Sequence, residues 1–407
     1  MYLDSTKPNR PPHRPRAMWW ILAIGPGVLG LAADNDAGGM LSYLVTGAAH
    51  HLVWFLGALI GMVPITYTIQ ELALRVGVAT QKPYSQLLRG KFGRLGVIIN
   101  GIALHMLNAL ILVTEFLGMA SALRLIGLPW GAGLVLSWAL VIGVTSYRHY
   151  PGLERLLLVL AIFNFAFIPA LFYLHPAQGA WTIALGQGIS TPVFFLLLAL
   201  AGNAIAPWMI YWQQNAVWSG SVSSLSLGRK DIRLGILAQV SMAAIVMLIG
   251  ALAVTSTASP LENPLAWLAH AAGPLVSQLF ALGIFDAGFL AACTISLSSA
   301  WMLSEVLHGT PPPKAVTPTG GRSRGIHVLT LTVTAGIVLW PHLAVGSIAL
   351  WAQALGALWM PISLGMLIIV ARDVRLMGPL AIRPGRQRWL WVIVLVFVLL
   401  AMASFLF

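Results

Sequence analysis

The stretch MWWILAIGPGVLGLAADNDAGGMLSYLVTGAA, from Met18 to Ala49, decides the fold class of this chain. It is long and apolar enough to cross a bilayer, for which a helix needs about 20 apolar residues. Asp34 and Asp36 nevertheless lie in its interior, where a charged group costs roughly 2.5–3.5 kcal/mol. Glycines and a proline flank the acids, so we expect the helix to unwind there, around a buried site or cavity. Carboxylates and free backbone carbonyls in such a break favour a cation.

The composition indicates an integral membrane protein. Of the 407 residues, 58% are hydrophobic and 8% are charged, whereas soluble domains have about 25% charged residues. The net charge of +12 does not indicate nucleic-acid binding, because the basic residues are scattered over short loops and form no stripe. The single cysteine, Cys293, excludes a disulfide framework and a cysteine metal cluster.

Hydropathy predicts an all-α integral membrane protein with eleven transmembrane helices. With this number of spans, all of the 23 Lys and Arg except Arg124 fall on one side of the membrane. Because cytoplasmic loops carry the excess of basic residues, we expect a multi-pass protein of the cell membrane, with its N-terminus in the cytoplasm and Phe407 outside. The expected spans are 18–48, 52–74, 97–123, 130–147, 153–174, 190–218, 234–257, 272–307, 327–345, 347–371 and 389–407.

Matching breaks in two halves of the chain predict an internal repeat. The sixth span contains AGNAIAP at 201–207, a polar and proline interruption five spans after the one around Asp36. A repeat of five spans, an odd number, must be inverted, and matched broken helices indicate a binding site at the membrane midplane. Pro207 alone would be an ordinary kink. We therefore expect a cytoplasmic tail at 1–17, two inverted five-helix repeats at 18–174 and 190–371, and an extra C-terminal helix at 389–407.

Five dispersed groups of residues, in order, carry a family resemblance. They are Gly25-Pro26-Gly27 followed nine residues later by DAGG at 36–39, QELALRVG at 70–77, TEFLG at 114–118, Gln353 with Pro361, and DVRLMG at 373–378. The chain resembles the Nramp family (natural resistance-associated macrophage proteins) of divalent-metal transporters over its first ten spans. The resemblance implies the inverted-repeat architecture called the LeuT fold, and a secondary transporter that is not an enzyme.

By this resemblance, the first, sixth and tenth spans hold the transported metal. Asp36 matches the family's aspartate, whereas Gly39 replaces its asparagine and Ala206 replaces its methionine. Oxygen ligands without a thioether suit hard cations, and the chain is similar here to the Nramp-related magnesium transporters. We expect Mn²⁺ or Mg²⁺ as cargo and no permanently bound cofactor. The expected metal-site residues are Asp36, Asp34, Gly39, Ala206 and Gln353, together with Ala33 and Asn203, which would contribute their backbone carbonyls.

The residues expected to move protons differ from those of the family. Its two sixth-span histidines are Trp208 and Gln213 here, neither of which takes up a proton, so we expect weak or absent proton coupling. His105, Asn108 and Glu115 share one helix face. They are expected either to line a cation or proton route or to form an internal hydrogen-bonded stripe.

Two other classes of function stay open. A sodium-coupled organic-solute symporter of the same fold would direct helix-terminal amides at a substrate carboxylate, which two acids disfavour. An intramembrane aspartyl protease needs two aspartates that share a proton, and Asp36 and Asp286 lack its flanking motifs. Asp286 is expected on an ion path or, slightly favoured, at the interface, and Glu71 and Glu305 are expected to pair with loop arginines. The expected partners are divalent metal ions and membrane lipid, without nucleic acid, for a monomer or weak oligomer.

Overall fold

Every regular element in the described part of the chain is a helix. The computed structural model describes residues 33–146, 156–176, 179–185, 191–220, 222, 224–253, 260–309 and 321–406. The expected tail at 1–17 and the Gly25-Pro26-Gly27 motif therefore lie outside the described residues. The elements are α3 (Ala37–Gly47), α4 (Leu52–Thr80), α5 (Tyr84–Leu125), α6 (Trp130–Thr145), η2 (Ala161–Ala166), α8 (Phe167–Tyr173), α9 (Ala180–Leu185), α10 (Thr191–Ala204), α11 (Trp208–Trp218), α12 (Leu225–Leu252), α13 (Pro264–His308), α14 (Gly321–Ile337), α15 (Val345–Ala371), α16 (Val374–Met377), η3 (Gly378–Leu380) and α17 (Pro384–Leu406).

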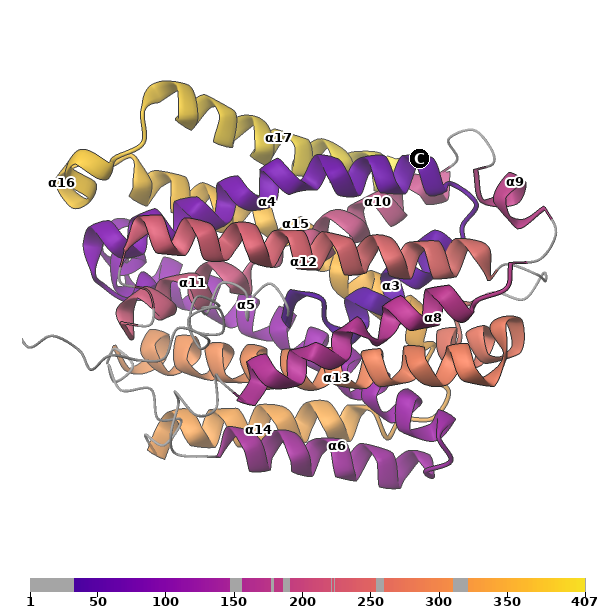
Figure 1. Ribbon diagram of the computed structural model, residues 1–407. Helices are drawn as coiled ribbons and strands as arrows, with labels where there is room; N and C mark the ends of the chain where they lie inside the picture. Colours follow the sequence, from indigo (N-terminus) through magenta and orange to yellow (C-terminus); the bar gives the residue numbers. More distant parts are fainter. Residues whose placement is uncertain are drawn as a thin grey trace, which may run out of the picture.

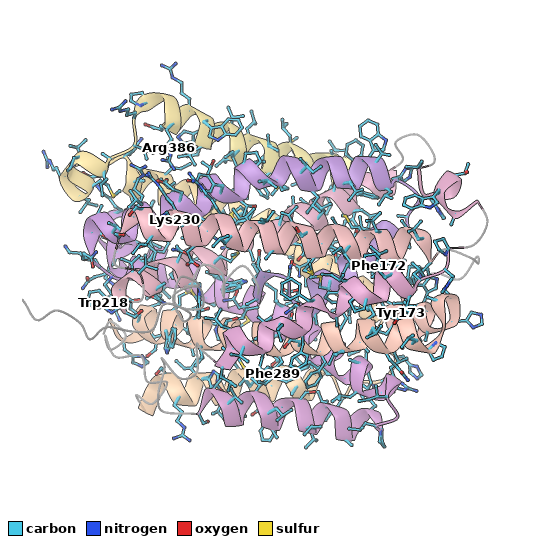
Figure 2. The ribbon with its side chains drawn as sticks, in the orientation of Figure 1. Phe172, Tyr173, Trp218, Lys230, Phe289 and Arg386 are labelled. Carbon is cyan, nitrogen blue, oxygen red and sulfur yellow. The ribbon has the colours of Figure 1, made fainter. Side chains whose placement is uncertain are left out.

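The described helices have the lengths and surface of a multi-pass membrane protein. Eight segments among the described residues are long and apolar enough to cross a bilayer, and each overlaps one predicted span. The bundle exposes large apolar side chains that suit contact with lipid, including Phe172 and Tyr173 at the end of α8 (Figure 2). The eight segments are Leu52–Thr80, Tyr84–Leu125, Leu156–Tyr173, Val193–Trp218, Leu225–Leu252, Pro264–His308, Val345–Ala371 and Pro384–Leu406.

The predicted number of eleven spans stays a prediction. The spans expected at 130–147 and 327–345 correspond to the shorter helices α6 and α14. Helix α14 begins and ends earlier than expected, and the chain turns at 338–340, just before Pro341. Most of the first expected span lies outside the described residues.

Two long helices contain a glycine break close to the start of the predicted span. Gly93 in α5 has φ +70°, and Gly273 in α13 has φ +83° and precedes Pro274. Glycine adopts these left-handed values without steric cost, so each chain changes direction there. The spans predicted from 97 and from 272 begin close to these breaks, and the sequence analysis did not predict the helical segments before them.

The short helix α3 lies in the interior of the bundle, where it packs against α12, α13 and α15 (Figure 1). Its approach to α12 requires glycine on both sides. A Cβ on Gly47 would lie 2.1 Å from the carbonyl oxygen of Met247, and one on Gly250 would lie 2.1 Å from that of Leu44. This backbone-to-backbone contact fixes the helix that begins at Asp36.

The break in the sixth predicted span is present where the sequence places it. Helix α10 ends at Ala204 and α11 begins at Trp208, after Pro207 as its N-cap residue. Just before the break, Gly202 allows α10 to contact α15. A Cβ added at this position would lie 1.9 Å from the carbonyl oxygen of Gln353. The fold thus brings the two chain breaks and α15 together.

Candidate functional site

Asp36 is a buried carboxylate whose described partners are neutral amides. It is the N-cap residue of α3, and its side chain accepts a hydrogen bond from the N–H of Gly39. Gln353 Nε2 also donates to both of its carboxylate oxygens. Asp36 is only 2% exposed. A buried carboxylate held by neutral donors and the positive end of a helix still favours a cation beside it.

Asp34 connects the first break to the second. Its Oδ2 accepts a hydrogen bond from Gln239 Nε2 of α12 at 2.7 Å. The carboxylate also accepts from the backbone N–H of Ala206, which lies between α10 and α11. Gln239 Nε2 lies 3.3 Å from the carbonyl oxygen of Ala204 as well. Asp34 is therefore held by α12 and by the sixth-span break, on a different set of partners from Asp36.

Asn203 directs its side chain, and not only its backbone, at the first break. Its Nδ2 donates to the carbonyl oxygen of Gly39 at 2.8 Å. Its Oδ1 is buried and has no hydrogen-bond partner among the described residues. The sequence analysis considered only the backbone carbonyl of Asn203. Gly39, which has no side chain where the family has an asparagine, is the signal that could have pointed to the side chain of Asn203.

Hydrogen bonds connect four of the seven expected metal-site residues, Asp36, Gly39, Asn203 and Gln353, and a separate one connects Asp34 to Ala206. Asp34 and Asp36 are near neighbours in the chain and belong to the same break. Ala33 is fully buried beside Asp34, but no described contact joins its carbonyl to the others. The described residues contain no group of three or more His, Cys, Asp and Glu that could hold a metal ion. Cation binding here would therefore rely on one or two carboxylates together with amide and carbonyl oxygens and water.

Two of the residues expected along an ion pathway, Glu115 and His105, lie in different parts of the bundle. Glu115 accepts hydrogen bonds from Ala37 N–H at 2.8 Å and from Thr114 Oγ1 at 3.2 Å, so it contacts the same helix end as Asp36. His105 instead lies 2.8 Å from Ser299 Oγ and 3.3 Å from Thr330 Oγ1, between α13 and α14.

The remaining pathway residues are buried polar groups with unmet hydrogen-bonding atoms. Asn108 Oδ1, Trp208 Nε1 and Gln213 Nε2 have no partner among the described residues. All three residues are 1% exposed. Nothing described joins Trp208 or Gln213 to the two aspartates.

Asp286 lies inside the bundle and contacts a neighbouring helix. It is 5% exposed and follows the break at Gly273 in α13. Its Oδ2 accepts a hydrogen bond from Asn164 Nδ2 of η2 at 2.8 Å. Both the ion-path and the interfacial interpretation of Asp286 stay predictions.

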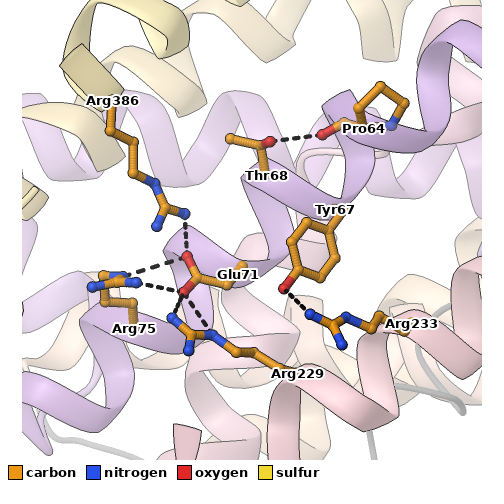
Figure 3. A network of polar contacts seen from close by, with 8 residues as sticks. All are labelled: Pro64, Tyr67, Thr68, Glu71, Arg75, Arg229, Arg233 and Arg386. Carbon is orange, nitrogen blue, oxygen red and sulfur yellow. Dashed lines mark hydrogen bonds and ion pairs between the residues drawn. The ribbon is translucent and has the colours of Figure 1, made fainter. Parts of the chain in front are cut away.

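Glu71 pairs with arginines, as expected, although these belong to helices (Figure 3). Arg75 of α4 lies 2.7 Å from it and Arg229 of α12 lies 2.6 Å from it, and Arg386 of α17 forms a third ion pair. The carboxylate thus joins three helices at one end of the bundle.

Glu305 forms no direct ion pair with an arginine among the described residues, although the positive charge of Arg89 lies near enough to attract it. Glu305 accepts a hydrogen bond from Ser85 Oγ at 2.6 Å, and the nearby Arg89 donates to the backbone carbonyl of Val306. Ser85 reaches the acid because the start of α5 packs beside the end of α13. This contact joins residues that are 220 positions apart, so the local sequence does not predict it.

Comparison with known proteins agrees with this architecture. The divalent metal cation transporter MntH of Mesorhizobium japonicum is 22% identical over 405 residues, which cover 93% of this chain and 87% of that protein. A manganese transporter of Eremococcus coleocola, in complex with an aromatic bis-isothiourea substituted compound, superposes with a TM-score of 0.74 at 18% identity, over 96% of this chain and 88% of the other. Mhp1, a nucleobase-cation-symport-1 family transporter in a closed conformation, superposes with a TM-score of 0.61 at 13% identity, over 94% and 89%.

These structural neighbours share the LeuT-like fold, and the fold is what their likeness shows. The family model for "Natural resistance-associated macrophage protein-like" proteins matches residues 27–406, nearly the whole chain. This protein is a member of the Nramp family of membrane transporters and is not an enzyme.

Proposed function

We propose that this protein takes up a divalent metal cation, Mn²⁺ or Mg²⁺, which binds between the breaks of the first and sixth spans. The observation that carries the proposal is Asp36, a buried carboxylate beside the amide oxygen of Asn203, with neutral hydrogen-bond donors as its described partners. Asp34 supplies a second negative charge at the same break. Two acids suit a doubly charged ion, since they offset part of the free energy of its dehydration.

The ligand chemistry favours hard cations. The groups at the break are carboxylates, amides and backbone groups, and no thioether is present at Ala206. Oxygen ligands suit Mg²⁺ and Mn²⁺, and Mg²⁺ usually keeps several waters, for which the small residue Ala206 leaves room. The curated relatives are named divalent metal cation transporters, and the solved neighbour is named a manganese transporter, which supports the same class of cargo.

The proposal includes the organisation expected from the sequence. Inverted repeats at 18–174 and 190–371 would rock against each other around the ion, with an eleventh helix at 389–407 and a cytoplasmic N-terminus. Proton coupling would be weak or absent. A sodium-coupled organic-solute symporter is the alternative, because Mhp1 shares the fold, but the acids at the break favour a cation as the bound species.

Uptake in proteoliposomes tests the proposal. We expect entry of Mn²⁺ and Mg²⁺, loss of entry to background in Asp36→Ala, and normal entry in the control Glu262→Ala, which removes an exposed carboxylate. Asp34→Asn is expected to weaken uptake. Wild-type uptake by Asp36→Ala at equal protein content would contradict the site, and uptake of amino acids or nucleobases without metal would favour the alternative.

A further inference from the structure

We propose that the side-chain oxygen of Asn203 is a metal ligand that reaches the first-span break from the sixth span, through the space that Gly39 leaves empty. It would complete an oxygen-only pair with Asp36 and set the selectivity of the site for hard divalent cations. This inference rests on the proposed function and specifies which side chain shares the cargo with Asp36.

The geometry places the two oxygens side by side. A Cβ built on Gly39 would lie 2.0 Å from Asn203 Oδ1 and 2.8 Å from Asp36 Oδ1. Both oxygens therefore lie within 3 Å of one point, which a side chain at position 39 would occupy. Gly39 is needed here because of this close approach, since its backbone is part of the regular helix α3.

The hydrogen bond made by the other end of the amide fixes its orientation. Asn203 Nδ2 donates to the Gly39 carbonyl oxygen at 2.8 Å. The flipped amide would set two oxygens against each other at this position and is disfavoured. The side-chain oxygen is consequently the atom that lies toward Asp36.

Asn203 Oδ1 lacks the donor that a buried acceptor normally has. The residue is 1% exposed, and no described group donates to this oxygen. The nearest amide donor of α15, Gln353 Nε2, is already bonded to Asp36. Two neighbouring acceptors, one of them anionic, repel each other unless they share a cation or a donor. The oxygen without a partner therefore supports a cation shared by Asn203 and Asp36.

The backbone around Asn203 holds this oxygen in place. A Cβ on the preceding residue, Gly202, would lie 1.9 Å from the Gln353 carbonyl oxygen and 2.8 Å from the Ala357 backbone nitrogen. The α10 backbone is therefore in direct contact with α15. Because α15 also donates to Asp36 through Gln353, both proposed ligands are positioned by the same helix.

Moving the amide from one span to the other tests the inference. Gly39→Ala and Gly39→Asn each introduce a Cβ that clashes with Asn203 Oδ1, so both are expected to lose Mn²⁺ uptake. Asn203→Ala removes the proposed ligand and frees the space that a side chain at position 39 would need. Its KM for Mn²⁺ is expected to rise at least about tenfold. In the double variant G39N/N203A an amide returns from the first span, and KM is expected to recover to within a few-fold of wild type.

The matched control is G39A/N203A, which relieves the same clash without returning an amide. We expect it to keep the raised KM, so that recovery in G39N/N203A is due to the oxygen and not to packing. If the Gly39 variants do not fold, as judged by size-exclusion profile, the near-isosteric pair N203D and N203L decides. N203D keeps an oxygen toward Asp36 but loses the N–H donated to Gly39, so it should retain weakened Mn²⁺ uptake and calorimetric Mn²⁺ binding, whereas N203L should lose both.

Two results separate this inference from the proposed function. Wild-type KM for Mn²⁺ in N203A and N203L, with Asp36→Ala inactive, would overturn the role of Asn203 and leave the site in place. Equal uptake by G39N/N203A and G39A/N203A would overturn it as well. Full activity of Asp36→Ala would contradict the proposed function itself.

Discussion

Gln353 of α15 donates its side-chain N–H to both carboxylate oxygens of Asp36, at 3.1 and 3.3 Å, across 317 positions of sequence. The contact orients the carboxylate that caps α3. Groups that orient a metal ligand affect metal affinity even when they do not touch the ion.

Gln353→Leu is therefore expected to weaken metal binding. The substitution removes the donor and leaves the buried Asp36 with fewer partners, so Mn²⁺ affinity should fall by roughly 10–100-fold. Isothermal titration of purified protein measures the change. Gln353→Glu serves as the comparison, because a second carboxylate beside Asp36 should retain divalent binding while changing selectivity. Unchanged affinity in Gln353→Leu would show that Asp36 needs no orientation from α15.

Ala206→Met is expected to raise the affinity for Cd²⁺ relative to Mn²⁺. Ala206 is 2% exposed, and its N–H is bonded to Asp34, so a thioether at this position would lie at the break. Sulfur prefers the softer ion. Competition of Cd²⁺ and Ca²⁺ against Mn²⁺ uptake measures selectivity; the parent protein should discriminate poorly against Ca²⁺. A parent protein that already binds Cd²⁺ far more tightly than Mn²⁺ would contradict the oxygen-ligand argument.

Metal entry is expected to carry few protons. Trp208 and Gln213 replace the two sixth-span histidines of the family, and neither side chain takes up a proton. Glu115 accepts a hydrogen bond from the N–H of Ala37. In liposomes with a pH-sensitive dye, Mn²⁺ uptake should cause little acidification, and an imposed proton gradient should barely accelerate it. Glu115→Gln keeps an oxygen for the Ala37 N–H and should retain uptake. Strong metal-dependent acidification that disappears in Glu115→Gln would show that Glu115 carries the proton.

Glu71→Gln is expected to destabilise the folded protein. The carboxylate is 1% exposed and forms ion pairs with Arg75, Arg229 and Arg386, so its neutralisation leaves three arginines together. Breaking a buried ion pair costs 3–5 kcal/mol, and we expect roughly 3 because these arginines reach solvent. Arg386→Gln leaves two partners and should cost about 1 kcal/mol or less. Thermal unfolding in detergent compares the two variants; equal melting temperatures of Glu71→Gln and wild type would contradict this role.

The topology predicts opposite labelling of the two ends of α17. The sole cysteine, Cys293, is fully buried, and its replacement by alanine provides a background for introduced cysteines. In cells, Gly385→Cys should react with a membrane-impermeant maleimide only after lysis, whereas Phe405→Cys, 65% exposed, should react in intact cells. The reverse pattern would place Phe407 in the cytoplasm and contradict the predicted orientation.

Local features of the sequence predicted the helical class and the two breaks. Asp36 can cap a helix through its own side chain, and Pro207 lacks the backbone N–H that a continuous helix would use, so adjacent residues favour both interruptions. Hydropathy likewise predicted the spans, since a lipid-facing helix must be apolar over most of its length. The glycine breaks at Gly93 and Gly273 were missed, because the residue type alone does not distinguish a glycine with a positive φ from one inside a helix.

Only the tertiary structure decided which polar groups meet. The side chain of Asn203 fills the space at Gly39, Asn164 bonds to Asp286, and Ser85 bonds to Glu305, each across more than a hundred residues. Such pairs depend on the rotation of each helix about its axis and on its depth in the bundle. Close glycine contacts such as Gly47 with Met247 set both of these, through backbone atoms that every residue carries and that leave no pattern in the sequence.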